Sequence, residues 1–101
     1  MSQIRTAIVT GAGGGLGRAV TEALADAGLN VTAVDINNDA AARINQGRPE
    51  LAERILALGG DIRSADFCAD IVTRTVEKFG SVQILVNNAG MTRDNLSMRL
   101  K

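Results

Sequence analysis

The residues best suited to bind a charged ligand form a glycine-rich stretch near the N-terminus. After Thr10, it reads Gly11, Ala12, Gly13, Gly14, Gly15, Leu16 and Gly17. Glycine accepts positive φ angles and has no Cβ, so its backbone can approach a ligand closely. A helix that starts here aims unpaired N–H groups and a partial positive charge at the turn. A pyrophosphate fits such a turn; the alternative is a tight turn that binds nothing.

A single carboxylate follows at a distance that suits the same ligand. Asp35 lies 18 residues after Gly17, and an acidic residue in this place can accept both hydroxyls of an adenosine ribose. The carboxylate would also repel a 2′-phosphate, by a few kcal/mol at an effective dielectric of about 20. Asp35 therefore predicts NAD rather than NADP as the cofactor. The alternative is a solvated aspartate at a strand end or helix cap.

Short apolar runs alternate with helical patterns along the chain and would position these groups. We expect strands at residues 4–9, 30–35, 61–67 and 82–86, and helical segments at 16–27, 40–46, 49–58 and 70–79. Strands that alternate with helices predict an α/β fold with a parallel sheet covered on both faces. Four strands in the order 3-2-1-4 would form a Rossmann-type doubly wound sheet, truncated after the fourth strand. Residues 1–101 would then be a single, partial dinucleotide-binding domain.

The predicted topology gathers the candidate residues at one end of the sheet. Ligands of doubly wound sheets bind at the carboxyl ends of the strands, where the glycine turn, Asp35, Asp66 and Asn87 would lie. Residues 91–101 have a mixed pattern, with a helix starting near Asp94 as one possibility. The predicted helix at 70–79 has Val72, Val76 and Phe79 on one face. The fourth strand would have no outer neighbour, and helix faces meant to cover later strands would lie bare. We therefore expect self-association through this edge, or a partner chain.

Composition excludes several classes of function. The formal net charge is zero, so nothing suggests binding to nucleic acid or to an anionic membrane. Histidine is absent, which removes the Ser-His-Asp triad and most zinc sites, and we expect no metal site. Cys68 is the single cysteine and gives no disulfide framework. Without an apolar run of membrane-spanning length or a signal peptide, we expect a cytoplasmic protein.

Two motifs in order give the chain a family resemblance. Thr10-Gly11-x-x-x-Gly15-x-Gly17 resembles the cofactor motif of the short-chain dehydrogenase/reductase family, and Asn87-Asn88-Ala89-Gly90 resembles its second signature. Gly14 also fits the spacing of the family's extended branch, but the second signature favours the classical branch. Residues 91–100 resemble the 3-oxoacyl-(acyl-carrier-protein) reductase members. The resemblance covers the N-terminal, cofactor-binding part of the family's domain.

The resemblance implies a role for each matched position. Gly11 to Leu16 would wrap the pyrophosphate and the adenosine side, and Gly17 would allow close helix packing. The remaining implied contacts are Asp35 and Ile36 with the adenine ribose, Asp66 and Phe67 with the adenine, and Asn87, Ala89 and Gly90 with the floor near the ribose. Asn87 would also tie strands together.

The family's chemistry implies groups that this sequence lacks. Its members use an Asn, a Ser, a Tyr and a Lys beyond the matched region, with the Tyr as the acid–base group. This chain has no tyrosine, and Lys78 and Lys101 do not match the family position. We therefore expect no catalytic residue in this chain. We expect it to be the cofactor-binding portion of an NAD(P)-dependent oxidoreductase and to be inactive alone. The alternatives are a non-catalytic nucleotide-binding module that needs a partner chain, and a scaffold with a vestigial turn.

Overall fold

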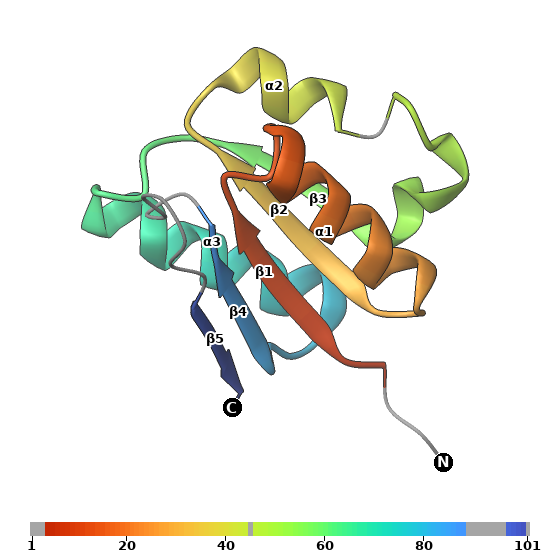
Figure 1. Cartoon of the computed structure of the whole chain (residues 1–101). Coiled ribbons are helices and arrows are strands. Elements are labelled where there is room, and N and C mark those ends of the chain that lie inside the picture. Colours follow the sequence, from red (N-terminus) through yellow and green to blue (C-terminus); the bar gives the residue numbers. More distant parts are fainter. Residues whose placement is uncertain (1–3, 45, 89–96, 101) are drawn as a thin grey trace.

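The protein forms one sheet flanked by helices (Figure 1). The structure is a computed structural model and describes residues 4–44, 46–88 and 97–100. The elements are β1 (Thr6–Thr10), α1 (Gly15–Asp26), β2 (Asn30–Asp35), α2 (Asn38–Arg43), the 3₁₀ helix η1 (Pro49–Arg54), β3 (Ile55–Gly59), α3 (Ala65–Phe79), β4 (Ile84–Asn87) and β5 (Ser97–Leu100).

The sheet has the topology that the sequence predicts for its first four strands. Its order is β3-β2-β1-β4-β5, and β1 to β4 pair in parallel. In this register Thr10 at the end of β1 lies between Val34 of β2 and Asn87 of β4. The carboxyl ends of the three central strands therefore meet at one edge of the sheet. This arrangement confirms a Rossmann-type parallel sheet in the order 3-2-1-4.

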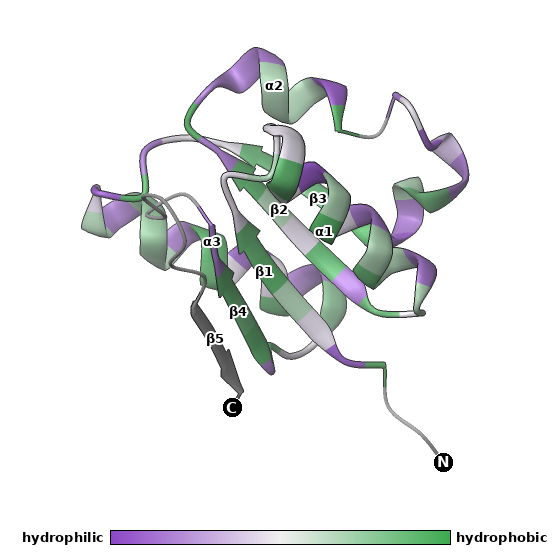
Figure 2. Ribbon diagram, viewed as in Figure 1, coloured by the Kyte–Doolittle hydropathy of each residue, from purple (hydrophilic) through white to green (hydrophobic). Residues whose placement is uncertain are grey.

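Alternate residues of the strands pack against different helices. Ala7 and Val9 of β1 are fully buried in a core shared with α1, α2 and η1, whereas Ile8 packs in a second core with Ile71 of α3. Figure 2 shows the apolar character of β1 and β4 and the hydrophilic residues on the outer sides of the helices. Because both faces of the sheet are covered, its strands read as almost continuous apolar runs.

The third strand lies earlier in the chain than the sequence predicts. Strand β3 is Ile55–Gly59 and pairs with β2, whereas 61–67 contains a turn and the start of α3. The predicted strand at 61–67 is wrong, and the predicted helix at 49–58 is correct for residues 49–54 alone. Periodicity cannot separate a buried strand from a helix in a short apolar run such as 55–58. Pairing with β2 makes residues 55–59 a strand, so the helical part is limited to residues 49–54.

Helix α3 begins earlier than predicted and buries a different side. The Ser64 side chain caps it by accepting a hydrogen bond from the Phe67 N–H at 3.2 Å. Its buried residues are Ile71 and Thr75. Val72 and Val76, which the apolar pattern places on one face of this helix, are 49% and 44% exposed. The helix therefore does not pack on the sheet through the face that the pattern indicates.

The outer edge of β4 is occupied, contrary to prediction. Strand β5 pairs with β4 in antiparallel orientation, with Asn87 opposite Ser97. A strand edge carries unpaired N–H and C=O groups, and a further strand satisfies them. The possible helix start at Asp94 lies outside the described residues.

Neither a membrane-spanning helix nor a metal cluster is present in residues 4–44, 46–88 and 97–100. There, no helix is long and apolar enough to cross a membrane. In the same residues, no group of three or more Cys, Asp or Glu side chains could hold a metal ion.

Candidate functional site

The glycine turn connects β1 to α1 in a fixed shape. Gly11 has a φ of 66°, which an L-residue with a side chain rarely adopts. The Ala12 N–H donates to the Val34 carbonyl at 2.9 Å, and the Gly14 N–H donates to the Gly11 carbonyl at 3.4 Å. Gly14 occupies the N-cap of α1, and no side chain caps the helix. The positive end of α1 therefore faces the turn with its first N–H groups available to a ligand.

Gly17 is the position where the turn and helix approach most closely. A Cβ on Gly17 would lie 2.0 Å from the Gly11 carbonyl oxygen and 2.8 Å from Asn88 Nδ2. Asn88 Nδ2 itself donates to the Gly11 carbonyl oxygen at 3.2 Å. The second signature therefore supports the first directly, because its asparagine holds the carbonyl against which α1 packs.

Asp35 lies at the end of β2 and bonds to backbone on two sides. Its Oδ2 accepts a hydrogen bond from the Gly13 N–H at 2.9 Å, and its Oδ1 accepts one from the Asn37 N–H at 2.9 Å. The side chain of Asn37 then caps α2 by accepting from the Ala40 N–H. The carboxylate is thus held between the glycine turn and the start of α2.

A cleft of about 390 Å³ opens beside Asp35 at the carboxyl edge of the sheet. Its lining comes from the ends of β1, β2 and β3 and consists of Gly11, Val34, Asp35, Ile36, Gly60, Asp61, Ile62 and Arg63. Arg63 forms an ion pair with Asp61 at 2.8 Å. The hydrogen bonds from Arg63 hold the pKa of the Asp61 carboxyl below its usual value of 3.8.

The structure places Asp66 and Phe67 away from the cleft lining. Both lie in the first turn of α3, where Asp66 is exposed, instead of at a strand end. The Phe67 ring packs against Gly60, where an added Cβ would lie 2.5 Å from the ring. The strand-end positions belong to Asp61 and Ile62, which sequence reasoning missed. The rule that selected Asp66 would have selected Asp61 if β3 had been placed correctly.

The start of the second signature meets the glycine turn across the sheet. Thr10 Oγ1 donates to Asn87 Oδ1 at 3.1 Å, which confirms that Asn87 ties β4 to β1. Asn88 is a second contact that the sequence analysis did not assign, although it lies in the motif. Ala89 and Gly90 lie outside the described residues.

The sequence as a whole matches the family model for the short chain dehydrogenase over residues 5–101. This chain belongs to the short-chain dehydrogenase family. The 3-oxoacyl-[acyl-carrier-protein] reductase of Staphylococcus epidermidis is 37% identical to it over 99 residues, which cover 96% of this chain and 40% of that protein. The chain therefore spans about two fifths of the length of this family relative.

Solved structures of short-chain dehydrogenases share the same fold. The hydroxysteroid dehydrogenase from Escherichia coli has a TM-score of 0.79 and 37% identity, with 88% of this chain and 38% of that chain covered. The 3-ketoacyl-(acyl-carrier-protein) reductase from Brucella melitensis, solved with NADH, has a TM-score of 0.73 and 31% identity, with 82% and 33% covered.

Proposed function

We propose that this chain is the cofactor-binding part of an NAD-dependent short-chain oxidoreductase and binds the dinucleotide in the cleft beside Asp35. One observation carries the proposal: the glycine turn, the uncapped start of α1 and the Asp35 carboxylate converge on one side of the sheet. A dinucleotide needs a partner for its pyrophosphate and another for its adenosine ribose, and these groups supply both.

The glycine turn fits a pyrophosphate sterically and electrostatically. Gly14 and Gly15 would carry added Cβ atoms without a close contact: the nearest atom to one at Gly14 is 3.9 Å away, and none lies within 4 Å at Gly15. The turn is therefore open to a ligand at these two positions, which begin α1. Gly11, Ala12, Gly13 and Leu16 complete the stretch proposed to surround the pyrophosphate, with Gly17 as its packing contact.

The cleft fits an adenosine by its mixed lining. Val34, Ile36 and Ile62 offer apolar surface for a purine ring, and Asp35 offers acceptors for ribose hydroxyls. Asp61, in the loop after β3, lines the cleft and is a better-placed polar partner for the purine than Asp66. We therefore assign the adenine contacts of this proposal to Asp61 and Ile62, with Phe67 packed against Gly60. Asn87, Ala89 and Gly90 remain proposed for the floor beyond the adenosine.

The proposed preference for NAD over NADP follows from charge. A 2′-phosphate would bring about two negative charges next to the Asp35 carboxylate, and the repulsion amounts to a few kcal/mol at an effective dielectric of about 20. Arg63 is the basic side chain in the cleft lining. It is already paired with Asp61, so it offers a 2′-phosphate little net attraction.

The proposed reaction interconverts an alcohol and a carbonyl. The bound cofactor would supply the hydride, and the residues of this chain would bind and orient its adenosine side. By resemblance to the reductases of 3-oxoacyl chains, a 3-oxoacyl thioester is the substrate class we propose for the whole protein. With no tyrosine in the sequence, we propose that this chain alone does not turn substrate over.

A non-catalytic module that works with a partner chain is the second candidate function. The exposed Val72 and Val76 favour it, because they give α3 an apolar surface for another chain. Adding candidate partner chains and measuring NADH oxidation separates the two candidate functions. Oxidation of NADH supports the oxidoreductase, and its absence supports the non-catalytic module. The cytoplasmic location expected from the sequence stays a prediction.

A fluorescence titration of NADH tests the proposal. The absence of Trp and Tyr keeps the protein's own emission low. We expect saturable binding that ADP-ribose displaces, because the proposed contacts are all on the adenosine and pyrophosphate side. Reduced nicotinamide mononucleotide should not displace NADH. A folded sample that gives no saturable signal would refute the proposal.

A further inference from the structure

Asp35 accepts a hydrogen bond from the glycine turn that is proposed to hold the pyrophosphate. We infer that Asp35 is a positioning residue as well as a ribose ligand: its carboxylate holds the glycine turn in the shape that receives the pyrophosphate. The inference rests on the proposed function and deepens it. It predicts that Asp35 contributes to the affinity for a part of the cofactor that it does not touch.

The hydrogen bonds define the connection. Gly13 and Asp35 are separated by 22 residues, and the Gly13 N–H donates to Asp35 Oδ2 at 2.9 Å. The other oxygen accepts from the Asn37 N–H, also at 2.9 Å. Hydrogen bonds to a charged acceptor are roughly twice as strong as neutral ones. The carboxylate therefore fixes the middle of the glycine turn against the end of β2.

The backbone at Gly13 packs closely against Ala40 and the Asp35 side chain. A Cβ on Gly13 would lie 2.5 Å from the Ala40 Cβ and 3.0 Å from Asp35 Oδ2. The Asp35 carbonyl oxygen accepts from the Gly60 N–H at 3.0 Å. Asp35 thus joins the loops that follow β1, β2 and β3, which are the loops that form the cleft.

Asp35 can hold the glycine turn and bind the ribose at the same time, because its carboxylate has enough acceptor positions for both. An ionised carboxylate offers about four lone-pair positions, and the two backbone N–H groups use two of them. The other two remain available to the 2′ and 3′ hydroxyls of a ribose. The hydrogen bond between the Gly13 N–H and Asp35 can therefore persist when NAD binds.

The two effects of Asp35 on the pyrophosphate have opposite signs. As a negative charge near an anion, the carboxylate opposes pyrophosphate binding. As the acceptor that shapes the turn, it favours binding. If charge alone mattered, removing the carboxylate would tighten the binding of a ligand without ribose hydroxyls. The inference predicts that such binding weakens instead.

A comparison of two ligands and three proteins separates these effects. The ligands are NADH and an NADH analogue that lacks both hydroxyls on its adenosine ribose. The proteins are the wild type, Asp35→Ala and, as a matched control, Asp39→Ala, which removes a nearby exposed carboxylate. We expect Asp35→Ala to lower the affinity for the analogue at least about threefold, which is the effect of losing a modest hydrogen bond. Asp39→Ala should leave it unchanged or slightly tighter.

The outcomes distinguish the inference from the proposed function. If the wild type does not bind NADH, the proposed function fails and the inference fails with it. If the wild type binds NADH but Asp35→Ala binds the analogue as tightly as the wild type or more tightly, the inference alone fails. Partial recovery of analogue binding in Asp35→Asn, which keeps one acceptor oxygen, would support the positioning role.

A measurement on the wild-type fold covers the case in which Asp35→Ala does not fold. An amide proton that donates to a carboxylate changes its NMR shift when the carboxyl is protonated. We expect the Gly13 and Asn37 amide signals to move together during an acid titration. Asp61 and Arg63 also line the cleft, and Asp39 is an exposed carboxylate in the first turn of α2. Asp39→Asn and Asp61→Asn should therefore preserve the Gly13 movement. A Gly13 signal that does not follow Asn37 would overturn the inference.

Discussion

At the start of α1, Gly17 lies against the Gly11 carbonyl oxygen, where a Cβ would be 2.0 Å from it. We predict that Gly17→Ala lowers the free energy of unfolding by about 1–3 kcal/mol, as overpacking of a rigid contact does. The helix start must also shift away from the turn, so NADH binding should weaken. Urea unfolding and NADH titration measure the two effects.

Gly15→Ala is the matched control for this substitution. A Cβ on Gly15 meets nothing within 4 Å, and alanine favours helix over glycine by up to about 1 kcal/mol. The stability of this variant should be equal to or above that of the wild type. Equal loss of stability in both alanine variants would show that the close contact at Gly17 is not what requires glycine.

Single residues of the site differ in how well the sequence predicts them. Gly17 and Asp35 are predictable because their spacing follows from one tight unit of strand, turn and helix. Asp61 was missed because its position depends on where β3 ends. The apolar residues 55–58 fit either a strand or a helix until they are paired with β2. The hydrogen bond between the Gly13 N–H and the Asp35 carboxylate could not be predicted from the sequence pattern.

At the scale of elements, α3 docks on the sheet through a buried pair of hydroxyls. Thr32 of β2 and Thr75 of α3 are fully buried, and their Oγ1 atoms are 2.7 Å apart. The Thr75 hydroxyl donates to the Ile71 carbonyl at 2.7 Å, so the Thr32 hydroxyl must donate to Thr75. This pair lies on the buried side of α3, whereas Val72 and Val76, on the face that the apolar pattern indicates, are exposed.

We predict that Thr75→Val destabilises the protein by about 1–3 kcal/mol, because the Thr32 hydroxyl is left buried without its acceptor. Thr32→Val/Thr75→Val should recover most of this loss, since no unpaired hydroxyl remains. Urea unfolding of the single and double variants provides the test. Additive losses in the double variant would contradict the hydrogen-bond account.

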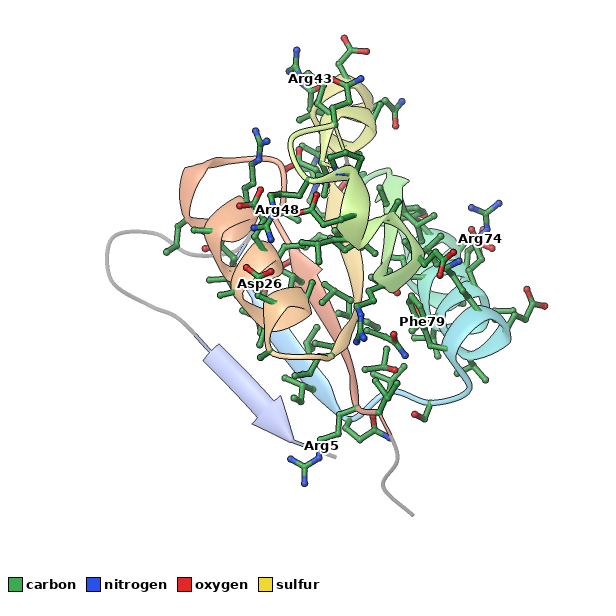
Figure 3. The ribbon with its side chains drawn as sticks, turned by 90° about the vertical axis from the view of Figure 1, so that its right-hand side faces the viewer. Arg5, Asp26, Arg43, Arg48, Arg74 and Phe79 are labelled. Carbon is green, nitrogen blue, oxygen red and sulfur yellow. The ribbon has the colours of Figure 1, made fainter. Side chains whose placement is uncertain are left out.

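An exposed ion-pair group joins the end of α1 to the segment before η1. Arg48 contacts Asp26 at 2.7 Å and Glu50 at 2.5 Å, and Figure 3 shows Arg48 and Asp26 side by side. Hydrogen bonds from Arg48 lower the pKa of Asp26 from 3.8 and that of Glu50 from 4.5. A lowered carboxyl pKa in the folded state means that protonation opposes folding.

The stabilisation from this group is therefore complete above the ordinary pKa values of 3.8 and 4.5 and disappears as the pH falls through the lowered folded values. We predict that Arg48→Gln has a lower urea midpoint than the wild type at neutral pH, and that the difference closes in strong acid. The exposed pair of Arg74 and Asp70, 3.5 Å apart, supplies the control variant Arg74→Gln. A difference that stays constant with pH would contradict the prediction.

At the scale of the whole molecule, the order of the parallel strands was predictable and the edges were not. Alternating strands and helices restrict a sheet to few topologies, so β3-β2-β1-β4 follows from the pattern. Strand β5 has no comparable signal, because its pairing depends on an edge that exists only after β4 has joined the sheet. Helix α3 packs on the sheet through Ile71 and Thr75, not through the face with Val72 and Val76 that the apolar pattern indicates.

We predict that the chain associates with a second copy of itself through α3. Val72 and Val76 are exposed there, next to a groove of about 240 Å³ that includes Ile71 and Leu85. Exposed apolar patches of this kind favour association. Size-exclusion chromatography should show a concentration-dependent shift that Val72→Thr/Val76→Thr reduces. Ile4→Thr, which removes an exposed apolar residue elsewhere, should leave the shift unchanged, whereas a wild-type monomer at all concentrations would refute the prediction.

The ratio of NADPH to NADH dissociation constants, measured for the wild type and for Asp35→Ala, tests the central claim most directly. The account predicts that the wild type binds NADPH at least about tenfold more weakly than NADH, equivalent to 1.4 kcal/mol or more of repulsion. It also predicts that Asp35→Ala brings the ratio close to one, even where both affinities fall. A ratio that Asp35→Ala leaves unchanged would show that this carboxylate does not meet the adenosine ribose.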